Sequence, residues 1–298
     1  MTPLPDRLLP TLRALLNGCS QIFLQQHALC GALILVAIAV ENLALLPGAL
    51  LGALSGLLVA WRLGYGASDR DAGLYGYNAT LVGLLFASQF LWSLPMAVLL
   101  CAAAALATAL LHALLRRGRL RGGLPVYTLP FVLFGWLSLA SAELFGLESR
   151  SAAAQVLQGD ALGLGAALLR SIGQVIFLGS PLAGACVLLA LLFAGWRCAA
   201  WALGAAAASL LMALSLDGTS TSALFGLAGY NAVLVAIALS HRRIWAPLLG
   251  ILLSWLLQPC FGVLGLPPLT APFILACWLV LAAGRSRWLA PADATLRS

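Results

Sequence analysis

Two uncharged hydrogen-bonding residue types, glutamine and threonine, occur as spaced pairs inside otherwise apolar stretches of the chain. Gln21 and Gln174 each follow a short apolar segment. Thr128 and Thr270 each lie between two prolines. A glutamine amide and a threonine hydroxyl both offer donor and acceptor atoms, as the path of a small uncharged polar solute requires. Such residues also join neighbouring helices inside membranes, so both interpretations remain open at this level.

The composition of the chain places these residues in a membrane. Of its 298 residues 62% are hydrophobic and only 8% are charged, and its mean hydropathy is +1.03. Ordinary soluble domains contain about 25% charged residues. A helix that spans a bilayer needs about 20 predominantly apolar residues, and the chain has room for several. The sequence therefore predicts an all-α membrane protein.

Three motifs occur twice in the same order, and each contains a glutamine, asparagine or threonine that recurs in both copies. The first two pairs are separated by 153 residues and the third by 142. Three ordered pairs with two equal separations indicate an internal duplication. The corresponding polar residues are Gln21 and Gln174, Asn78 and Asn231, and Thr128 and Thr270.

The duplication predicts two copies, residues 1–146 and 161–298, joined by a polar linker at 147–160. Each copy is expected to hold one half-helix, at 8–23 or 161–177, that enters the membrane and stops inside it. Such breaks are tolerated where they face protein or a water-filled path. Five spans follow each half-helix. We expect the ten spans near 29–46, 48–63, 73–89, 94–114, 125–146, 182–195, 198–215, 222–240, 244–258 and 268–284.

The arginine clusters indicate that the two copies lie upside down to each other. Arg116–Arg121 follow the fourth span of the first copy, whereas His241–Arg243 follow the third span of the second copy. Short arginine-rich loops stay on the cytoplasmic side, so both of these loops are expected there. Because they follow different spans of their copies, loops at the same position in the two copies must face opposite sides of the membrane. Inverted repeats recur in transport proteins, whose substrate sites lie near mid-membrane where the copies meet. We expect both termini in the cytoplasm and, with short loops and no signal peptide, a bacterial inner membrane.

Two further elements of the motifs are expected to have structural roles. Asn78 and Asn231 each follow Gly-Tyr, and each is expected to tie down broken backbone. Proline has no N–H group, so the prolines around each threonine leave nearby backbone carbonyls without a helical donor. These carbonyls should be free to accept hydrogen bonds from a solute beside the threonine hydroxyl. The alternative is that each threonine only satisfies a kinked helix. The prolines are Pro125, Pro130, Pro267 and Pro272.

The sequence offers little for coupled transport or catalysis. Ion coupling usually needs ionisable or oxygen-rich sites inside the membrane, and no carboxylate or histidine recurs at equivalent points of the two copies. The sequence contains no HExxH, GxSxG or phosphate-loop motif. Its seven cysteines form no CxxC pair. We therefore expect no enzyme activity, metal or cofactor, and the arginines at segment ends mark topology rather than nucleic-acid binding.

These motifs resemble those of the urea transporter family. The stretch Gly73–Gly83, the two Leu-Pro-x-x-Thr-x-Pro-Phe segments and Gly173-Gln174-Val175 carry the resemblance, which covers about residues 12 to 284. It implies a homotrimer in membrane lipid, with one urea-conducting pore through each protomer between inverted five-helix repeats.

The resemblance also implies which residues line the pore. Leu24 stands where an aromatic residue is expected, and His27 and Ser180 stand where the family often has Asn. The implied pore residues are the half-helix pair Gln21 and Gln174, the pair Thr128 and Thr270, the wall pair Leu81 and Leu234, and the slot positions Leu24, Tyr77, Phe177 and Tyr230.

The leading interpretation is a passive urea channel. A channel for short amides, ammonia or water is an alternative within the same class. An ion-coupled secondary transporter is a second alternative, and it would need an ion site that the sequence does not reveal. A membrane enzyme or scaffold is a third, which the missing catalytic motifs disfavour.

Overall fold

The computed structural model describes residues 4–121, 123–150, 159–217 and 220–284. Within these ranges every regular element is a helix, which confirms the all-α prediction. The chain divides into two compact units, Met1–Ala154 and Gln155–Ser298, and each is described by itself.

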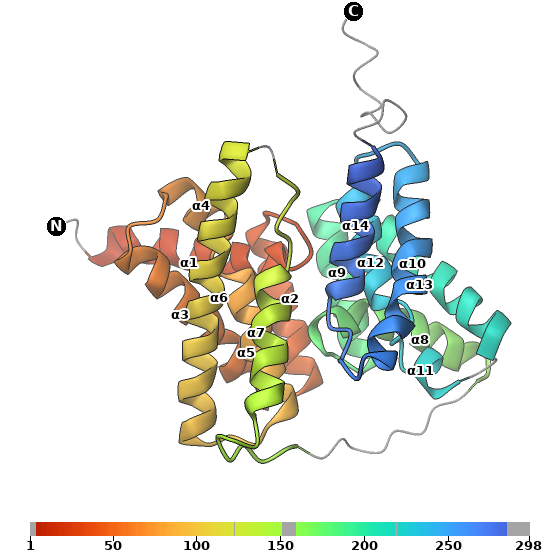
Figure 1. The fold of residues 1–298 in the computed structure, drawn as a ribbon, viewed down its shortest axis with the longest axis horizontal. Coiled ribbons are helices and arrows are strands. Elements are labelled where there is room, and N and C mark those ends of the chain that lie inside the picture. Colours follow the sequence, from red (N-terminus) through yellow and green to blue (C-terminus); the bar gives the residue numbers. More distant parts are fainter. Residues whose placement is uncertain (1–3, 122, 151–158, 218–219, 285–298) are drawn as a thin grey trace, which may run out of the picture. The chain divides into compact units, whose positions relative to one another are not determined.

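The first unit is built around one buried helix, α5. All residues of α5 from Tyr77 to Ala87 are buried, and the helix packs against α3, α6 and α7. Glycine makes the α3–α5 contact possible, because a Cβ on Gly52 would lie 2.2 Å from the Ala79 carbonyl oxygen. The helices, red to yellow-green in Figure 1, are α1 (Leu4–Gln21), α2 (Ala28–Glu41), η1 (Leu43–Leu45), α3 (Leu46–Arg62), α4 (Ala67–Asp71), α5 (Tyr77–Gln89), α6 (Leu94–Arg121) and α7 (Leu129–Ser141).

The second unit repeats this order of α-helices around α12, while its 3-10 helix η2 follows the first α-helix of the unit rather than the second. The residues of α12 from Asn231 to Ile237 are buried, and the helix packs against α10, α13 and α14. The helices, green to blue in Figure 1, are α8 (Ala161–Gly173), η2 (Gln174–Ile176), α9 (Pro181–Ala194), α10 (Trp196–Asp217), α11 (Thr221–Leu224), α12 (Tyr230–Leu239), α13 (Trp245–Val263) and α14 (Ala271–Ala283).

Left-handed backbone occurs at three equivalent places in the two units. The paired residues have the same separations, 153, 153 and 142, as the paired polar motifs. Residues with a Cβ rarely take positive φ, so the surrounding fold imposes these breaks. The pairs are Leu24 (59°) and Phe177 (64°), Gly73 (81°) and Gly226 (77°), and Tyr127 (48°) and Leu269 (44°).

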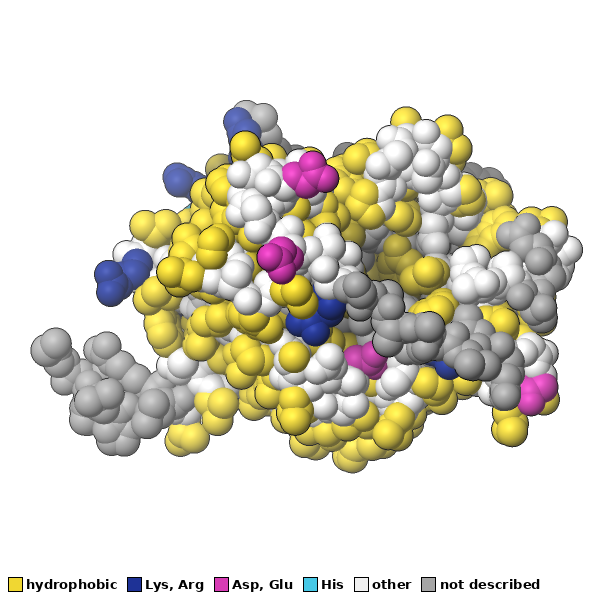
Figure 2. Space-filling view, turned by 90° about the horizontal axis from the view of Figure 1, so that it is seen from below, with side chains coloured by type: hydrophobic (Ala, Val, Ile, Leu, Met, Phe, Trp, Pro, Cys, Tyr) yellow, Lys and Arg dark blue, Asp and Glu magenta, His cyan; other side chains and the backbone are white. Residues whose placement is uncertain are grey.

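Several helices are suited to a membrane. Among the described residues, four are long and apolar enough to span one, and α8 with α9 forms a fifth candidate that is bent by 73°. Other apolar helices have 10–17 residues, so the expected total of ten spans stays a prediction, as does the inversion of the copies. Hydrophobic side chains cover much of the surface in Figure 2, and charged ones are few. The four long segments are Leu43–Arg62, Leu94–Leu120, Trp196–Leu216 and Trp245–Val263.

The helices α7 and α14 are among those that begin later than the sequence predicted. The spans expected at 125–146 and 268–284 begin at the first residues of α7 and α14, after the left-handed turns. Pro130 and Pro272 lie in the first turn of these helices, where a missing N–H breaks no helical bond. Pro130 and Pro272 therefore start helices instead of kinking them, and Pro125 and Pro267 lie in the non-helical residues that precede α7 and α14.

Candidate functional site

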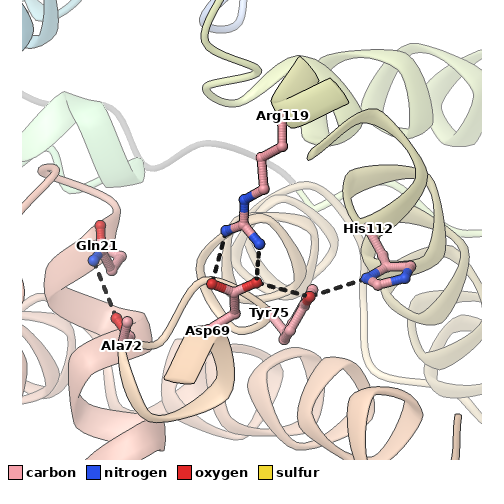
Figure 3. Close-up of polar contacts among 6 residues, drawn as sticks. All are labelled: Gln21, Asp69, Ala72, Tyr75, His112 and Arg119. Carbon is pink, nitrogen blue, oxygen red and sulfur yellow. Dashed lines mark hydrogen bonds and ion pairs between the residues drawn. The ribbon is translucent and has the colours of Figure 1, made fainter. Parts of the chain in front are cut away.

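The end of the first half-helix is bound to the turn before α5. Nε2 of Gln21, the last residue of α1, donates to the Ala72 carbonyl oxygen at 3.0 Å (Figure 3). One turn earlier, Asn17 Nδ2 donates to the Asp71 carbonyl oxygen at 2.7 Å. Gly73 permits this contact, because a Cβ there would lie 2.3 Å from the backbone of α1. We call Asp71, Ala72 and Gly73 the first anchor turn. Because the anchor turn uses Nε2 of Gln21 as a donor, the amide atom that can accept from another group is Oε1.

The second half-helix is bound to its own turn in the same way. Gln174 Nε2 donates to the Phe225 carbonyl oxygen at 3.3 Å. One turn earlier, Arg170 Nη1 donates to the Leu224 carbonyl oxygen at 3.2 Å. Gly226 again permits the contact, because a Cβ would lie 2.4 Å from a backbone nitrogen of α8. Leu224, Phe225 and Gly226 form the second anchor turn.

A half-buried side chain in left-handed backbone follows each glutamine. Leu24 occupies this place in the first unit and Phe177 in the second. The next helix then begins at a side-chain cap. His27 Nδ1 accepts from a first-turn N–H of α2 at 3.2 Å, and Ser180 Oγ accepts from one of α9 at 3.1 Å. The two departures from the expected Asn therefore keep a capping group at each position.

Thr128 lies in a turn that the Gly-Tyr-Asn motif holds. Asn78 Oδ1 accepts from Phe131 N at 3.0 Å, and its Nδ2 donates to the Tyr127 carbonyl oxygen at 3.4 Å. The Tyr77 hydroxyl donates to the same carbonyl at 2.5 Å. The Phe131 N–H belongs to the first turn of α7, where backbone donors lack helical partners. Thr128 is buried, and its hydroxyl does not cap α7.

The second unit holds Thr270 by the same device. Asn231 Oδ1 accepts from Phe273 N at 3.2 Å, and its Nδ2 donates to the Leu269 carbonyl oxygen at 3.2 Å. The same Nδ2 also lies 3.1 Å from Gln258 Oε1. Thr270 is buried and does not cap α14.

The remaining predicted pore residues lie on the two central helices. Leu81 and Leu234 follow the asparagines by about one turn on α5 and α12, and both are buried. Tyr77 is buried, whereas Tyr230 is half-buried. Helix α5 packs against both α1 and α7, and α12 against both α8 and α14. Each unit thus gathers one glutamine break and one threonine turn around a single helix.

Comparison with known proteins identifies the family. The family model described as urea transporter matches residues 12–285. The chain belongs to the urea transporter family. Urea transporter 1 of Ovis aries is 30% identical over 292 residues, which cover 89% of this chain and 75% of that protein. The protein of the same name from Mus musculus is 30% identical over 295 residues, which cover 90% and 75%.

Membership of the urea transporter family, together with the apolar helices, identifies an integral multi-pass membrane protein. The family is one of transporters rather than enzymes. The relatives named here are mammalian, so they do not support the expected bacterial inner membrane, which stays a prediction.

One polar cluster of this urea transporter family member was missed by the sequence analysis. Arg119 donates two bonds of 2.8 Å to Asp69, and this guanidinium holds the pKa of the Asp69 carboxyl below its ordinary value. The Tyr75 hydroxyl lies 3.4 Å from Asp69 Oδ2 and 3.0 Å from His112 Nδ1 (Figure 3). The His112 ring stacks on Tyr65 with centroids 3.7 Å apart.

The search for repeated residues explains why this cluster was passed over. The positions 153 residues after Asp69 and Tyr75 hold Ser222 and Ala228, so the cluster has no copy in the second unit. Arg170 was passed over for a similar reason, because its counterpart in the first unit is an asparagine. A charged residue within an apolar segment was the signal that could have revealed Arg170.

Proposed function

We propose that this protein is a passive channel that conducts urea across the membrane down its concentration gradient. The observation that carries the proposal is the repeated half-site. Each unit presents a glutamine amide fixed by an anchor turn and a buried threonine in a turn held by an asparagine. The relatives named Urea transporter 1 support urea as the solute.

In this proposal each unit is one inverted repeat of a half-helix and five spans, and the two half-sites face one pore. Opposite arginine bias in equivalent loops supports the inversion. Both termini lie in the cytoplasm, and three protomers assemble in the membrane, each with its own pore. The homotrimer rests on the family resemblance alone.

Urea needs acceptors along such a path. It is flat and uncharged, and its four N–H groups are hydrogen-bonded to water outside the membrane. Entry into a narrow apolar slot costs several kcal/mol for each polar group left unmatched. Gln21 Oε1, Gln174 Oε1 and the hydroxyls of Thr128 and Thr270 would replace that water, together with backbone carbonyls at the breaks.

Apolar walls would hold the flat solute and reject hydrated ions. Leucine and aromatic side chains keep the path too narrow for a hydration shell while offering no charge to replace it. Leu24 in place of an aromatic residue would give one wall less ring surface. The proposed wall residues are Leu81, Leu234, Leu24, Phe177, Tyr77 and Tyr230.

Flux measurements on purified protein in liposomes test this function. Light scattering would follow urea efflux with and without a proton or sodium gradient. Thr128→Val and Thr270→Val each remove one acceptor for a urea N–H group. A urea donor left without a partner inside the pore raises the barrier to passage by about 1–3 kcal/mol. We expect urea permeability to fall roughly tenfold or more in each variant, since 1.4 kcal/mol is a factor of ten.

Thr80→Val provides a matched control. Thr80 is fully buried, and its hydroxyl donates within the chain to the Gly76 carbonyl oxygen at 2.9 Å. We expect its permeability to stay near that of the wild type. Uptake that depends on an ion gradient would contradict the passive mechanism. Flux of amides or water without urea would favour the alternative solutes, and unchanged urea flux in both test variants would contradict the acceptor role.

A further inference from the structure

The break after the first half-helix is closed by an ionisable side chain, whereas the break after the second is not. His27 is the N-cap of α2, and its Nδ1 accepts from the Cys30 N–H at 3.2 Å. The corresponding cap of α9 is Ser180, whose hydroxyl accepts from the Ala183 N–H at 3.1 Å. Each bond satisfies a first-turn donor that has no helical partner. Of the two caps, only the imidazole can lose its acceptor atom by taking up a proton.

The bond from the Cys30 N–H determines the tautomer of His27. A backbone N–H can only donate, so Nδ1 carries no proton and the proton of the neutral ring lies on Nε2. Protonation turns Nδ1 into a donor that faces another donor, and the cap is lost. The new positive charge would also lie at the N-terminus of α2, where the helix dipole is already positive. Both effects disfavour the capped arrangement in acid.

The cap is joined directly to the residues around Gln21. The Ser20 hydroxyl accepts from the His27 N–H at 3.2 Å and donates to the Gln25 carbonyl oxygen at 2.8 Å. The Ser20 carbonyl oxygen accepts from the Gln25 N–H at 3.1 Å. Gln21 lies inside this closed segment, next to Ser20. Gly173 stands at the place of Ser20 in the second unit, and a glycine cannot make the side-chain bonds.

The start of α2 packs directly on α1, the helix that ends at Gln21. A Cβ on Gly31, in the first turn of α2, would lie 1.8 Å from the Leu16 carbonyl oxygen. Backbone contact this close leaves the two helices little room to shift independently. Loss of the His27 cap would therefore displace the end of α1 as well as the start of α2, and the Gln21 amide with it.

Protons can reach His27 from water. His27 is half-buried, and the residue before it, Gln26, is exposed and lines a pocket of about 440 Å³. Histidine is the side chain whose charge ordinarily changes between about pH 5 and 8. The other ionisable groups that the structure describes beside the break belong to types that keep one charge over most of that range. They are Arg13 and Asp71, which line the same pocket, and the buried thiols of Cys19 and Cys30.

We propose that His27 is a positioning residue whose protonation disrupts the first half-site, so that urea permeability falls in acid. The inference rests on the proposed function, because it assumes that urea passes Gln21. At neutral and alkaline pH the uncharged ring caps α2 and holds the segment from Ser20 to His27. In acid the cap is lost and the Gln21 acceptor leaves its place. The second half-site keeps its geometry, because the Ser180 hydroxyl does not titrate in this range.

Urea permeability at two pH values tests this inference. Purified protein in phosphatidylcholine liposomes would be equilibrated at about pH 8 or about pH 5 on both sides of the membrane. Light scattering would then follow urea efflux, and urea itself stays uncharged at both values. We expect wild-type permeability to be lower in acid by roughly three- to tenfold, because a cap is lost and a charge opposes the helix dipole.

Variants of the three histidines of the chain locate the effect. His27→Asn keeps an N-cap oxygen without a titratable ring, and His27→Ser copies the cap of the second unit. Each variant is compared only with itself at the two pH values, and we expect its permeability to change by less than about 1.5-fold. The double variant His112→Gln with His241→Gln leaves His27 as the remaining histidine and should keep the wild-type fall.

Three results would overturn the inference alone. One is a wild-type permeability that is the same at both pH values. Another is a fall in H27N or H27S as large as that of the wild type. The third is loss of the fall in the double variant, which decides the matter without any change at His27 should those variants not fold. A wild-type protein without urea flux at either pH would instead overturn the proposed function, and this inference with it.

Discussion

Replacing Asn78 with alanine is expected to destabilise the protein by about 2–4 kcal/mol. The Phe131 N–H would lose its 3.0 Å bond to Asn78 Oδ1, in a site where Asn78 is 1% exposed. Removing the acceptor of such a buried donor costs about 1–3 kcal/mol. The Tyr127 carbonyl keeps its bond from the Tyr77 hydroxyl, so loss of the weaker 3.4 Å bond from Asn78 adds little. The small cavity left by the amide accounts for the remaining cost of about 1 kcal/mol.

Thermal unfolding of the detergent-solubilised protein would measure this effect. At about 2–4 °C per kcal/mol, the unfolding midpoint of N78A should fall by roughly 4–16 °C. Asn42→Ala is the matched control, because Asn42 is exposed and caps η1 through a bond from Ala44 N at 2.9 Å. Water can replace that bond, so we expect a loss of about 1 kcal/mol or less. An N78A midpoint no lower than that of N42A would refute the assignment of Asn78 as the support of the Thr128 turn.

Two further predictions concern other parts of the chain. Gly226→Ala should destabilise the protein by roughly 2–5 kcal/mol, because the new Cβ would lie 2.4 Å from a backbone nitrogen of α8 and the residue has a φ of 77°. Gly204→Ala is the control, because open space surrounds Gly204 and no destabilisation is expected. Equal unfolding midpoints for the two variants would contradict this. Arg119 lowers the pKa of Asp69, so the Asp69 carboxylate stabilises the fold above its ordinary pKa of 3.8, and this contribution is lost as pH falls through the lower folded pKa. On acidification from about pH 5 to below the folded pKa, the wild type should therefore lose more stability than Asp69→Asn, by less than about 1 kcal/mol because Arg119 is exposed. Stability profiles that run parallel with pH in the two proteins would contradict this prediction.

Much of the candidate site could be predicted because its signals are local in the sequence. Composition identifies the membrane as solvent, since the apolar fraction needs no knowledge of contacts. The recurrence of Gln21 as Gln174 and of Thr128 as Thr270 pairs the candidate residues across the two copies. The motif Leu-Pro-x-x-Thr-x-Pro-Phe is specific enough to indicate the family that the comparison then identified.

Other features depend on contacts between residues far apart in the chain. The prolines beside the threonines left kinked spans possible, yet Pro130 and Pro272 lie in the first turns of α7 and α14, after the left-handed turns at Tyr127 and Leu269. Pro125 and Pro267 lie before those turns, outside any helix. A proline fixes its own φ but not the backbone on either side, so local sequence leaves both outcomes possible.

The sequence by itself determined the solvent, the duplication and the paired polar residues of this protein, because each is a property of residue type and spacing. Only the tertiary structure decided what holds those residues in place. Asn78 reaches the N–H of Phe131, 53 residues away, and Arg170 reaches the carbonyl of Leu224, 54 residues away. Such bonds form because buried backbone groups at a helix break must find partners wherever the fold provides them. The structure also shows that Asn17 and Arg170 have the same role, because each donates to a carbonyl of its anchor turn, Asn17 without a charge and Arg170 with one.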